Sequence, residues 1–112
     1  GQIRNRRPFP VKIFAITLLQ DAKPDNKFGA IFGDVHSVGW FSTMQTAEQE
    51  LQRNSEWYWQ HMYQYAVIEE YDEGTFKPVT NRKIFVYLPD SKIYQPIGEP
   101  ACMQRITNFA FG

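Results

Sequence analysis

The chain has 112 residues, of which 43% are hydrophobic and 21% are charged, so it has the size and composition of one globular domain rather than of a disordered chain or a coiled coil. Twelve Lys and Arg residues balance twelve Asp and Glu residues, and this balance excludes the strong overall field that attracts nucleic acids and anionic membranes. The single Cys excludes an internal disulfide and a multi-cysteine metal site.

Residues 1–10 form a basic segment at the start of the chain. Arg4, Arg6 and Arg7 carry positive charge there with no acidic residue between them, and two prolines interrupt regular structure. We expect a flexible, solvated arm, followed by a single domain over residues 11–112. A contact of this arm with nucleic acid or with an acidic partner is the alternative interpretation.

The segment "VKIFAITLLQ", residues 11–20, is apolar at its middle on both alternating faces and rich in β-branched residues. This pattern is typical of a central strand that is covered on two sides. A polar stretch over residues 21–27 then predicts a turn, and "FGAIFGD", residues 28–34, completes a predicted β-hairpin.

Glycines are spread through the second strand of this hairpin and the residues after it. Gly29, Gly33 and Gly39 lack the Lys and the Ser or Thr that follow the glycines of a phosphate-binding loop. We therefore expect bulges or bends at these positions rather than a nucleotide site.

A helix is predicted over residues 42–54. Ser42 can cap its start, with Gln45 reaching back as the third residue of a capping box, and Phe41 can pack against the first turn. Asn54 is expected to end the helix.

The predicted helix has one apolar side. Met44, Ala47 and Leu51 follow the spacing of three and four residues that places side chains on one face, so we expect them to pack on the sheet. The side expected to face water carries Gln45, Gln49 and Gln52.

Residues 55–62 combine two tryptophans with tyrosine, histidine and methionine, and they predict a second, short aromatic helix. From Tyr63 the apolar period becomes two, so a strand is expected to follow, with residues 66–68 at its buried centre. Glu69 begins an acidic run that we expect to return to solvent.

Three later segments also have the composition of strands: "TFKPV" at residues 75–79, "KIFVYL" at 83–88 and "KIYQPI" at 92–97. The last two are joined by Pro89, Asp90 and Ser91, which favour a turn. The first and third contain a proline, which cannot donate to a β-ladder, so these two strands are expected at the edges of a sheet.

These elements together predict an α+β fold. It consists of a mainly antiparallel sheet of about five strands, with the helix of residues 42–54 covering one face and the short aromatic helix closing an end. Phe109 and Phe111 in the closing segment are expected to dock on the core.

The sequence lacks the segments that place a chain in a membrane. No apolar run approaches the ~20 residues of a membrane-spanning helix, and no basic segment leads into an apolar run as in a secretory signal. A lone Cys is typical of a reducing compartment. We therefore expect a cytoplasmic protein that makes no membrane contact.

Four segments stand out together: "VGWFSTMQTAEQEL", "YQYAVIEEYDEG", "KIFVYL" and the closing "NFAFG". They resemble a family of small proteins of unknown function from bacteria and their phages, over roughly residues 11–112. This chain departs from the family pattern near Phe85, where a Trp is expected, and in its basic arm, which has no counterpart. The resemblance implies no activity, but a phage association would favour a host-directed inhibitor or decoy.

Residues with catalytic or metal-binding chemistry are few. Cys102 with His36 or His61 would supply two members of a nucleophilic site, but no third group is marked by spacing, and a lone Cys is more often a small buried hydrophobe. Asp34 and His36 would share one face of a strand as half of a metal site, although Asp34 is more often a turn residue. We therefore expect no enzyme activity, no cofactor and no metal.

Aromatic residues make up 16% of the chain and are concentrated between residues 57 and 65. Successive residues of a helix are rotated by about 100°, so Trp57, Tyr58 and Trp59 cannot all be buried beneath the same sheet. At least one ring is expected to be exposed, although bulky rings that simply fill a small core are the alternative explanation. The candidate binding surface consists of Trp57, Trp59, His61, Tyr63 and Glu69.

Two functions are compatible with this surface. The first is a non-enzymatic protein-interaction module, in which exposed aromatics and the acidic strand end contact a protein partner or a second copy of the chain. The alternative is a binder of a small ligand or of single-stranded nucleic acid, in which the aromatics stack on bases and the three arginines of the arm hold phosphates. The balanced charge does not favour nucleic acid, whose binding would weaken steeply with salt.

Overall fold

The structure of the chain is a computed structural model, which describes residues 12–20, 22–25, 29–32, 34–53, 63–72, 79, 81–99 and 109, with the backbone alone for 22–25 and 29–32. Its elements in chain order are β1 (Lys12–Leu19), β2 (Ala22–Asp25), β3 (Gly29–Phe32), β4 (Val35–Phe41), α1 (Met44–Arg53), β5 (Tyr65–Asp72), β6 (Asn81–Leu88) and β7 (Ile93–Ile97).

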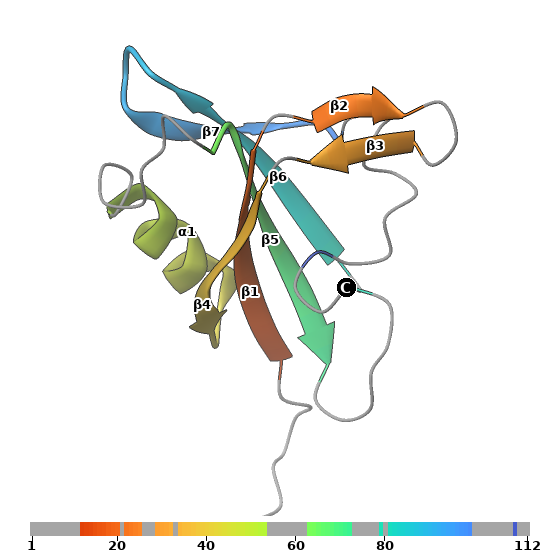
Figure 1. Cartoon of the computed structure of the whole chain (residues 1–112). Coiled ribbons are helices and arrows are strands. Elements are labelled where there is room, and N and C mark those ends of the chain that lie inside the picture. Colours follow the sequence, from red (N-terminus) through yellow and green to blue (C-terminus); the bar gives the residue numbers. More distant parts are fainter. Residues whose placement is uncertain are drawn as a thin grey trace, which may run out of the picture.

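The main sheet has five strands in the order β4-β1-β5-β6-β7, and each neighbouring pair is antiparallel. Helix α1 lies along one face of this sheet and contacts β1, β4, β5 and β7 (Figure 1). Strands β2 and β3 form a separate two-stranded sheet that extends to one side. The predicted α+β class and antiparallel five-stranded sheet are therefore confirmed.

The central strands β1 and β5 are buried on both faces. Alternate residues of β1 face α1, and the residues between them face the opposite side. The cluster beneath α1 consists of Phe14, Ile16, Leu18, Ala47, Leu51, Tyr63, Ala66, Ile68, Phe85 and Tyr94. The cluster on the other face consists of Leu19, Val67, Ile84 and Phe109. The predictions that residues 11–20 form a doubly covered strand and that Phe109 docks on the core are confirmed.

The predicted hairpin is wrong in its pairing. The partner of β1 is β4, and the expected turn over residues 21–27 contains β2 instead, which pairs with β3. The register continues from the pair Leu19 and Val35 to the pair Ala22 and Phe32, so the two ribbons are successive parts of one long hairpin. A proline is compatible with β2 because β3 is its one partner among the described strands, so the other edge of β2 needs no N–H for pairing.

A β-bulge interrupts the pairing of β1 with β4. Ile16 lies opposite Gly39 and Thr17 lies opposite Ser37, which leaves Val38 as the extra residue. The expectation of a bulge or bend is thus confirmed at Gly39. Asp34 and the residues after it do not form the expected turn, because they lead directly into β4.

The residue that caps helix α1 lies one position later than predicted. The hydroxyl of Thr43, not that of Ser42, caps it by accepting a hydrogen bond from the Thr46 backbone N–H at 3.0 Å. The Ala47 N–H donates to the Thr43 carbonyl at 3.1 Å. With the cap at Thr43, the third helical position is Thr46, so Gln45 has no capping role.

The apolar side of α1 is as predicted, since Ala47 and Leu51 are fully buried and Met44 packs against the same cluster. Gln52 is exposed, as predicted, but its side chain also bonds to β7. Its side-chain amide donates to the Tyr94 carbonyl at 2.6 Å, and its carbonyl oxygen accepts from the Tyr94 N–H at 3.0 Å. Gln52 therefore links α1 to β7, and its amide bonds the Tyr94 backbone as a neighbouring strand would.

Strands β6 and β7 are joined by the expected turn at Pro89, and the Lys92 N–H donates to the Leu88 carbonyl at 2.7 Å. Pro96 lies in β7 at an edge of the main sheet, as predicted. Val79 is described but is not in a strand. The predicted aromatic helix, Asn54, Phe111 and the rest of "TFKPV" lie outside the described residues, as does the basic arm.

Candidate functional site

Two members of the predicted binding surface are described, and both are buried. Tyr63 is 8% exposed and Glu69 is 0% exposed, so neither is available to a partner as expected. The other members, Trp57, Trp59 and His61, lie outside the described residues, as do Cys102 and the three arginines of the arm.

Glu69 lies at the centre of a polar network on the face of the sheet opposite α1. Its Oε2 accepts hydrogen bonds from Arg82 Nε at 3.0 Å, and Arg82 Nη2 lies 2.8 Å from the same oxygen. Its Oε1 accepts from the Tyr71 hydroxyl at 2.8 Å and from the Phe109 backbone N–H at 2.9 Å. Both carboxylate oxygens are therefore occupied by donors, as a buried charge requires.

Arg82 extends this network to the closing segment of the chain. Its Nη1 lies 2.8 Å from Oε1 of Glu99, and its guanidinium carbon lies 4.9 Å from the centre of the Phe109 ring. The side chain of Arg82 is itself only 10% exposed. The buried ion pair therefore positions Phe109 by a hydrogen bond to its backbone and by a cation–π contact to its ring.

The prediction that Glu69 faces solvent is wrong. It was based on the acidic run that Glu69 begins. The register places Glu69 beside Ala15 and Arg82, in the interior of the sheet. Ala15 leaves room for the carboxylate and Arg82 neutralises it. Burial continues to Tyr71, which is 6% exposed, and the alternation of Val67, Glu69 and Tyr71 on one face is the sequence signal that could have placed Glu69 inside.

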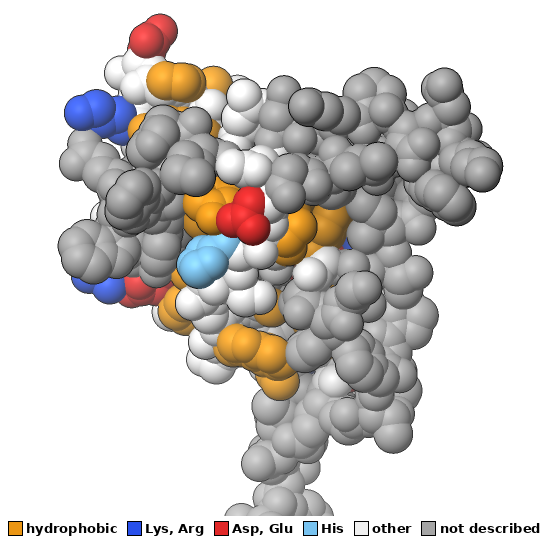
Figure 2. Space-filling view, viewed as in Figure 1, with side chains coloured by type: hydrophobic (Ala, Val, Ile, Leu, Met, Phe, Trp, Pro, Cys, Tyr) orange, Lys and Arg blue, Asp and Glu red, His pale blue; other side chains and the backbone are white. Residues whose placement is uncertain are grey.

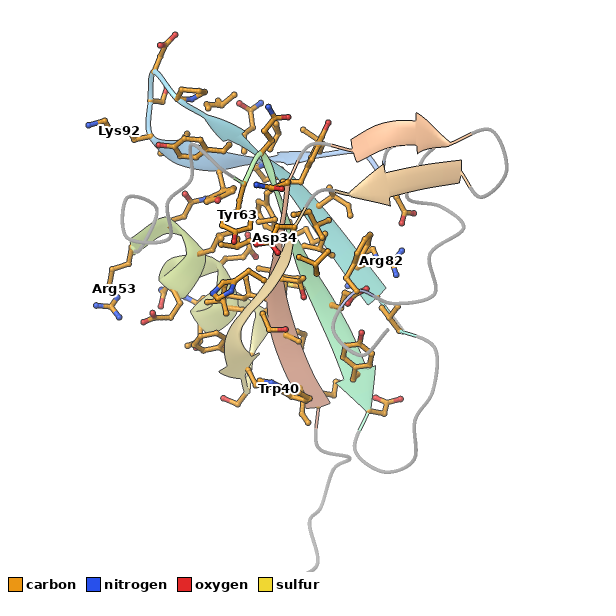
Figure 3. All side chains as sticks on the ribbon, viewed as in Figure 1. Asp34, Trp40, Arg53, Tyr63, Arg82 and Lys92 are labelled. Atoms are coloured by element: carbon orange, nitrogen blue, oxygen red, sulfur yellow. The ribbon has the colours of Figure 1, made fainter. Side chains whose placement is uncertain are left out.

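Tyr63 connects the residue before β5 to the start of β4. Its hydroxyl donates a hydrogen bond to Asp34 Oδ2 at 2.5 Å, and its ring centre lies 6.0 Å from that of His36, with the two planes tilted by 34°. Figure 3 shows Tyr63 and Asp34 side by side. The hydrogen bond to the Asp34 carboxylate raises the pKa of Tyr63 above 10.0, and burial and the carboxylate charge act in the same direction.

Asp34 and His36 share a face of the β4 edge, as expected for a strand, but the Asp34 carboxylate is engaged by Tyr63. Among the residues that the structure describes, no three His, Cys, Asp or Glu side chains are grouped so that they could hold a metal ion.

The two edges of the main sheet differ in their backbone. On β7, the outward N–H and C=O of Tyr94 are both bonded by Gln52, and Pro96, two residues later on the same edge, has no N–H. The outer edge of β7 is therefore closed to another strand at both positions.

On the outer edge of β4, the described residues provide no such protection. The Gln20 N–H donates to the Asp34 carbonyl at 2.9 Å, so Asp34 directs its backbone toward β1. Because bonding alternates along an antiparallel ladder, the N–H and C=O groups of Val35 and Ser37 are directed away from β1. Within the described part of the chain, no strand pairs with β4 on that side.

Four of the seven residues of β4 are exposed. The strand contains no Lys, Arg, Asp or Glu, and Val35 and Trp40 are 48% and 51% exposed. Both lie on the face opposite α1, since they pair with Leu19 and Ala15. His36 is also exposed. Figure 2 shows a pale blue histidine at the surface, with an acidic and several hydrophobic side chains near it.

The sequence analysis predicts no strand over residues 35–41, so it does not place Trp40 on a sheet edge. The signal that could have found it is the alternation of β-branched and aromatic residues before Ser42, which the bulge at Val38 disturbs. The exposed tryptophan of the described residues therefore lies on a sheet edge, at the end of β4 labelled in Figure 3.

Comparison with known proteins gives no match to a family model, to a curated protein or to a solved structure. The resemblance to small bacterial and phage proteins therefore stays a prediction. Among the described residues, no helix combines the length and the apolar composition that crossing a membrane requires.

Replacing Glu69 by Gln will test the buried network. The substitution leaves Arg82 buried beside a neutral amide, and we expect the free energy of unfolding to fall by about 3–5 kcal/mol in urea denaturation. The matched control is Glu70→Gln, one residue along, because Glu70 pairs with the exposed Lys12. Its loss should be much smaller, and equal losses for the two variants would contradict a special role for Glu69.

The pKa of Tyr63 predicts a pH dependence at the alkaline end. Its folded pKa is above the ordinary 10.0, so its contribution to stability is complete below that pH and is lost as the pH rises through the folded pKa. Asp34→Asn should lower the pKa of Tyr63, since it removes the charged acceptor. The phenolate absorbance of each protein, corrected with the corresponding Tyr63→Phe variant, measures this pKa, and an unchanged value would show that Asp34 does not set it.

Proposed function

We propose that the chain is a non-enzymatic interaction module that binds an extended segment of a protein partner along the outer edge of β4. The observation that carries the proposal is the outward backbone of Val35 and Ser37 on an exposed edge strand. An added strand would pair with these groups, which is a common way in which sheets recognise peptides.

The side chains of β4 fit such a contact. Val35 and Trp40 are about half exposed on one face of the strand, and Trp is among the residues that contribute most to interfaces. A partner strand would cover both side chains while its backbone pairs with the edge. Backbone pairing would supply affinity, and contact with Trp40 would supply selectivity.

The described polar residues support a binding role over a catalytic one. Glu69 is saturated by hydrogen bonds in the interior, and the Asp34 carboxylate is engaged by the Tyr63 hydroxyl. These groups stabilise the fold around the edge strand. If the resemblance to phage proteins holds, the partner would be a host protein, as for an inhibitor or decoy.

Selection of peptides from a random display library on the immobilised protein tests this proposal. We expect extended peptides that bind the wild-type protein but bind Ser37→Pro at least about tenfold more weakly, because the proline removes an outward N–H without touching the β1 ladder. Trp40→Ala should also weaken them with little change in the melting temperature.

The matched control is Gln95→Lys, an exposed position on β7, which should bind the same peptides as the wild-type protein. Binding should change little with salt, whereas a single-stranded oligonucleotide, tested in parallel, would lose affinity steeply if it bound through phosphates. Peptides that bind Ser37→Pro as well as the wild-type protein would contradict the proposal.

A further inference from the structure

Resting on the proposed function, we infer that the strand that pairs with β4 is the β4 of a second copy of this chain. Two copies related by a twofold axis would join their β4 edges in antiparallel order and form one continuous ten-stranded sheet, twice the five strands of one copy. Val35 and Ser37 of each copy would supply the backbone groups that pair.

The charge of the strand and of the chain favours a second copy. Edge strands are commonly protected from one another by Lys or other charged residues, and β4 has none among its seven residues. Two identical strands can therefore meet without placing like charges opposite each other. The formal net charge of the chain is +0, so no overall repulsion opposes the approach of two copies.

The contrast between the two edges of the sheet predicts that assembly stops at the dimer. Joining two β4 edges leaves a β7 edge at each end of the combined sheet. Each β7 edge is closed, because Gln52 bonds the outward groups of Tyr94 and because Pro96 has no N–H to offer. No further strand can then add in the same way, and the assembly does not grow into a fibre.

The pairing would cover Val35, and the bulge sets its extent. Trp40 lies on the same face as Val35 and would extend past the start of the partner's β4. The bulge at Val38 ends the regular part of the edge, so few backbone hydrogen bonds form. We therefore expect a weak dimer that forms as the protein concentration rises.

Sedimentation velocity over a range of protein concentrations tests the inference with the full chain. The wild-type protein should shift from monomer to dimer and no further. Ser37→Pro removes the outward N–H, and Ser37→Lys places a charge on the edge, so each should weaken dimerisation by about tenfold or more. Gln95→Lys, the matched change on the closed β7 edge, should dimerise as the wild-type protein does, and circular dichroism checks that each variant is folded.

Three results would overturn the inference. These are a wild-type protein that stays monomeric at every concentration, folded Ser37 variants that dimerise as the wild-type protein does, and growth of the wild-type protein beyond the dimer. The first result, combined with display-selected peptides that still bind β4, would refute self-pairing and leave the proposed function standing. Peptides that bind Ser37→Pro as tightly as the wild-type protein would refute the proposed function itself.

Discussion

Burial of both faces of the main sheet is the constraint on which this structure depends. The side chains of β1 and β5 that point toward α1 fill one cluster, and those that point away fill a second cluster with Phe109. The second face also contains a charge, and Glu69 is tolerated there because Arg82, Tyr71 and the Phe109 backbone satisfy its carboxylate. With both faces of its central strands buried, the described sheet can offer another molecule chiefly its edges.

The two edge strands of the main sheet differ in whether other described residues bond their outward backbone groups. An edge strand presents backbone donors and acceptors that bond to water until another strand pairs with them and displaces the water. On β7, the Gln52 amide replaces the missing neighbour and Pro96 removes a donor. On β4, the backbone of Val35 and Ser37 is directed outward with no described strand beside it, and the strand has neither proline nor Lys, Arg, Asp or Glu. This asymmetry locates the proposed contact on one side of the molecule.

The sequence predicted those features that depend on local periodicity. Three features were predicted from neighbouring residues alone and were found in the structure. They are the strand with two apolar faces within residues 11–20, the buried helix face of Ala47 and Leu51, and the turn at Pro89. The cap at Thr43 differed by one position because Ser42 and Thr43 are both good caps and the choice depends on how the chain leaves β4.

Features that depend on pairing between distant residues were not predictable in this way. Glu69 resembled a surface acid because its partners, Arg82 and Phe109, follow it by 13 and 40 residues. The bulge at Val38 shifts the alternation of β4, so the residue pattern does not predict this strand or the exposed position of Trp40. Only the register of the sheet reveals which groups face the open edge.

Amide hydrogen exchange of β4, measured in dilute and in concentrated protein, tests the open edge most directly. The account predicts that the Val35 and Ser37 amides exchange rapidly in dilute solution and become protected as the concentration rises, while the His36 amide, directed toward β1, is protected throughout. Protection of Val35 and Ser37 in dilute protein, or rapid exchange at every concentration, would contradict it.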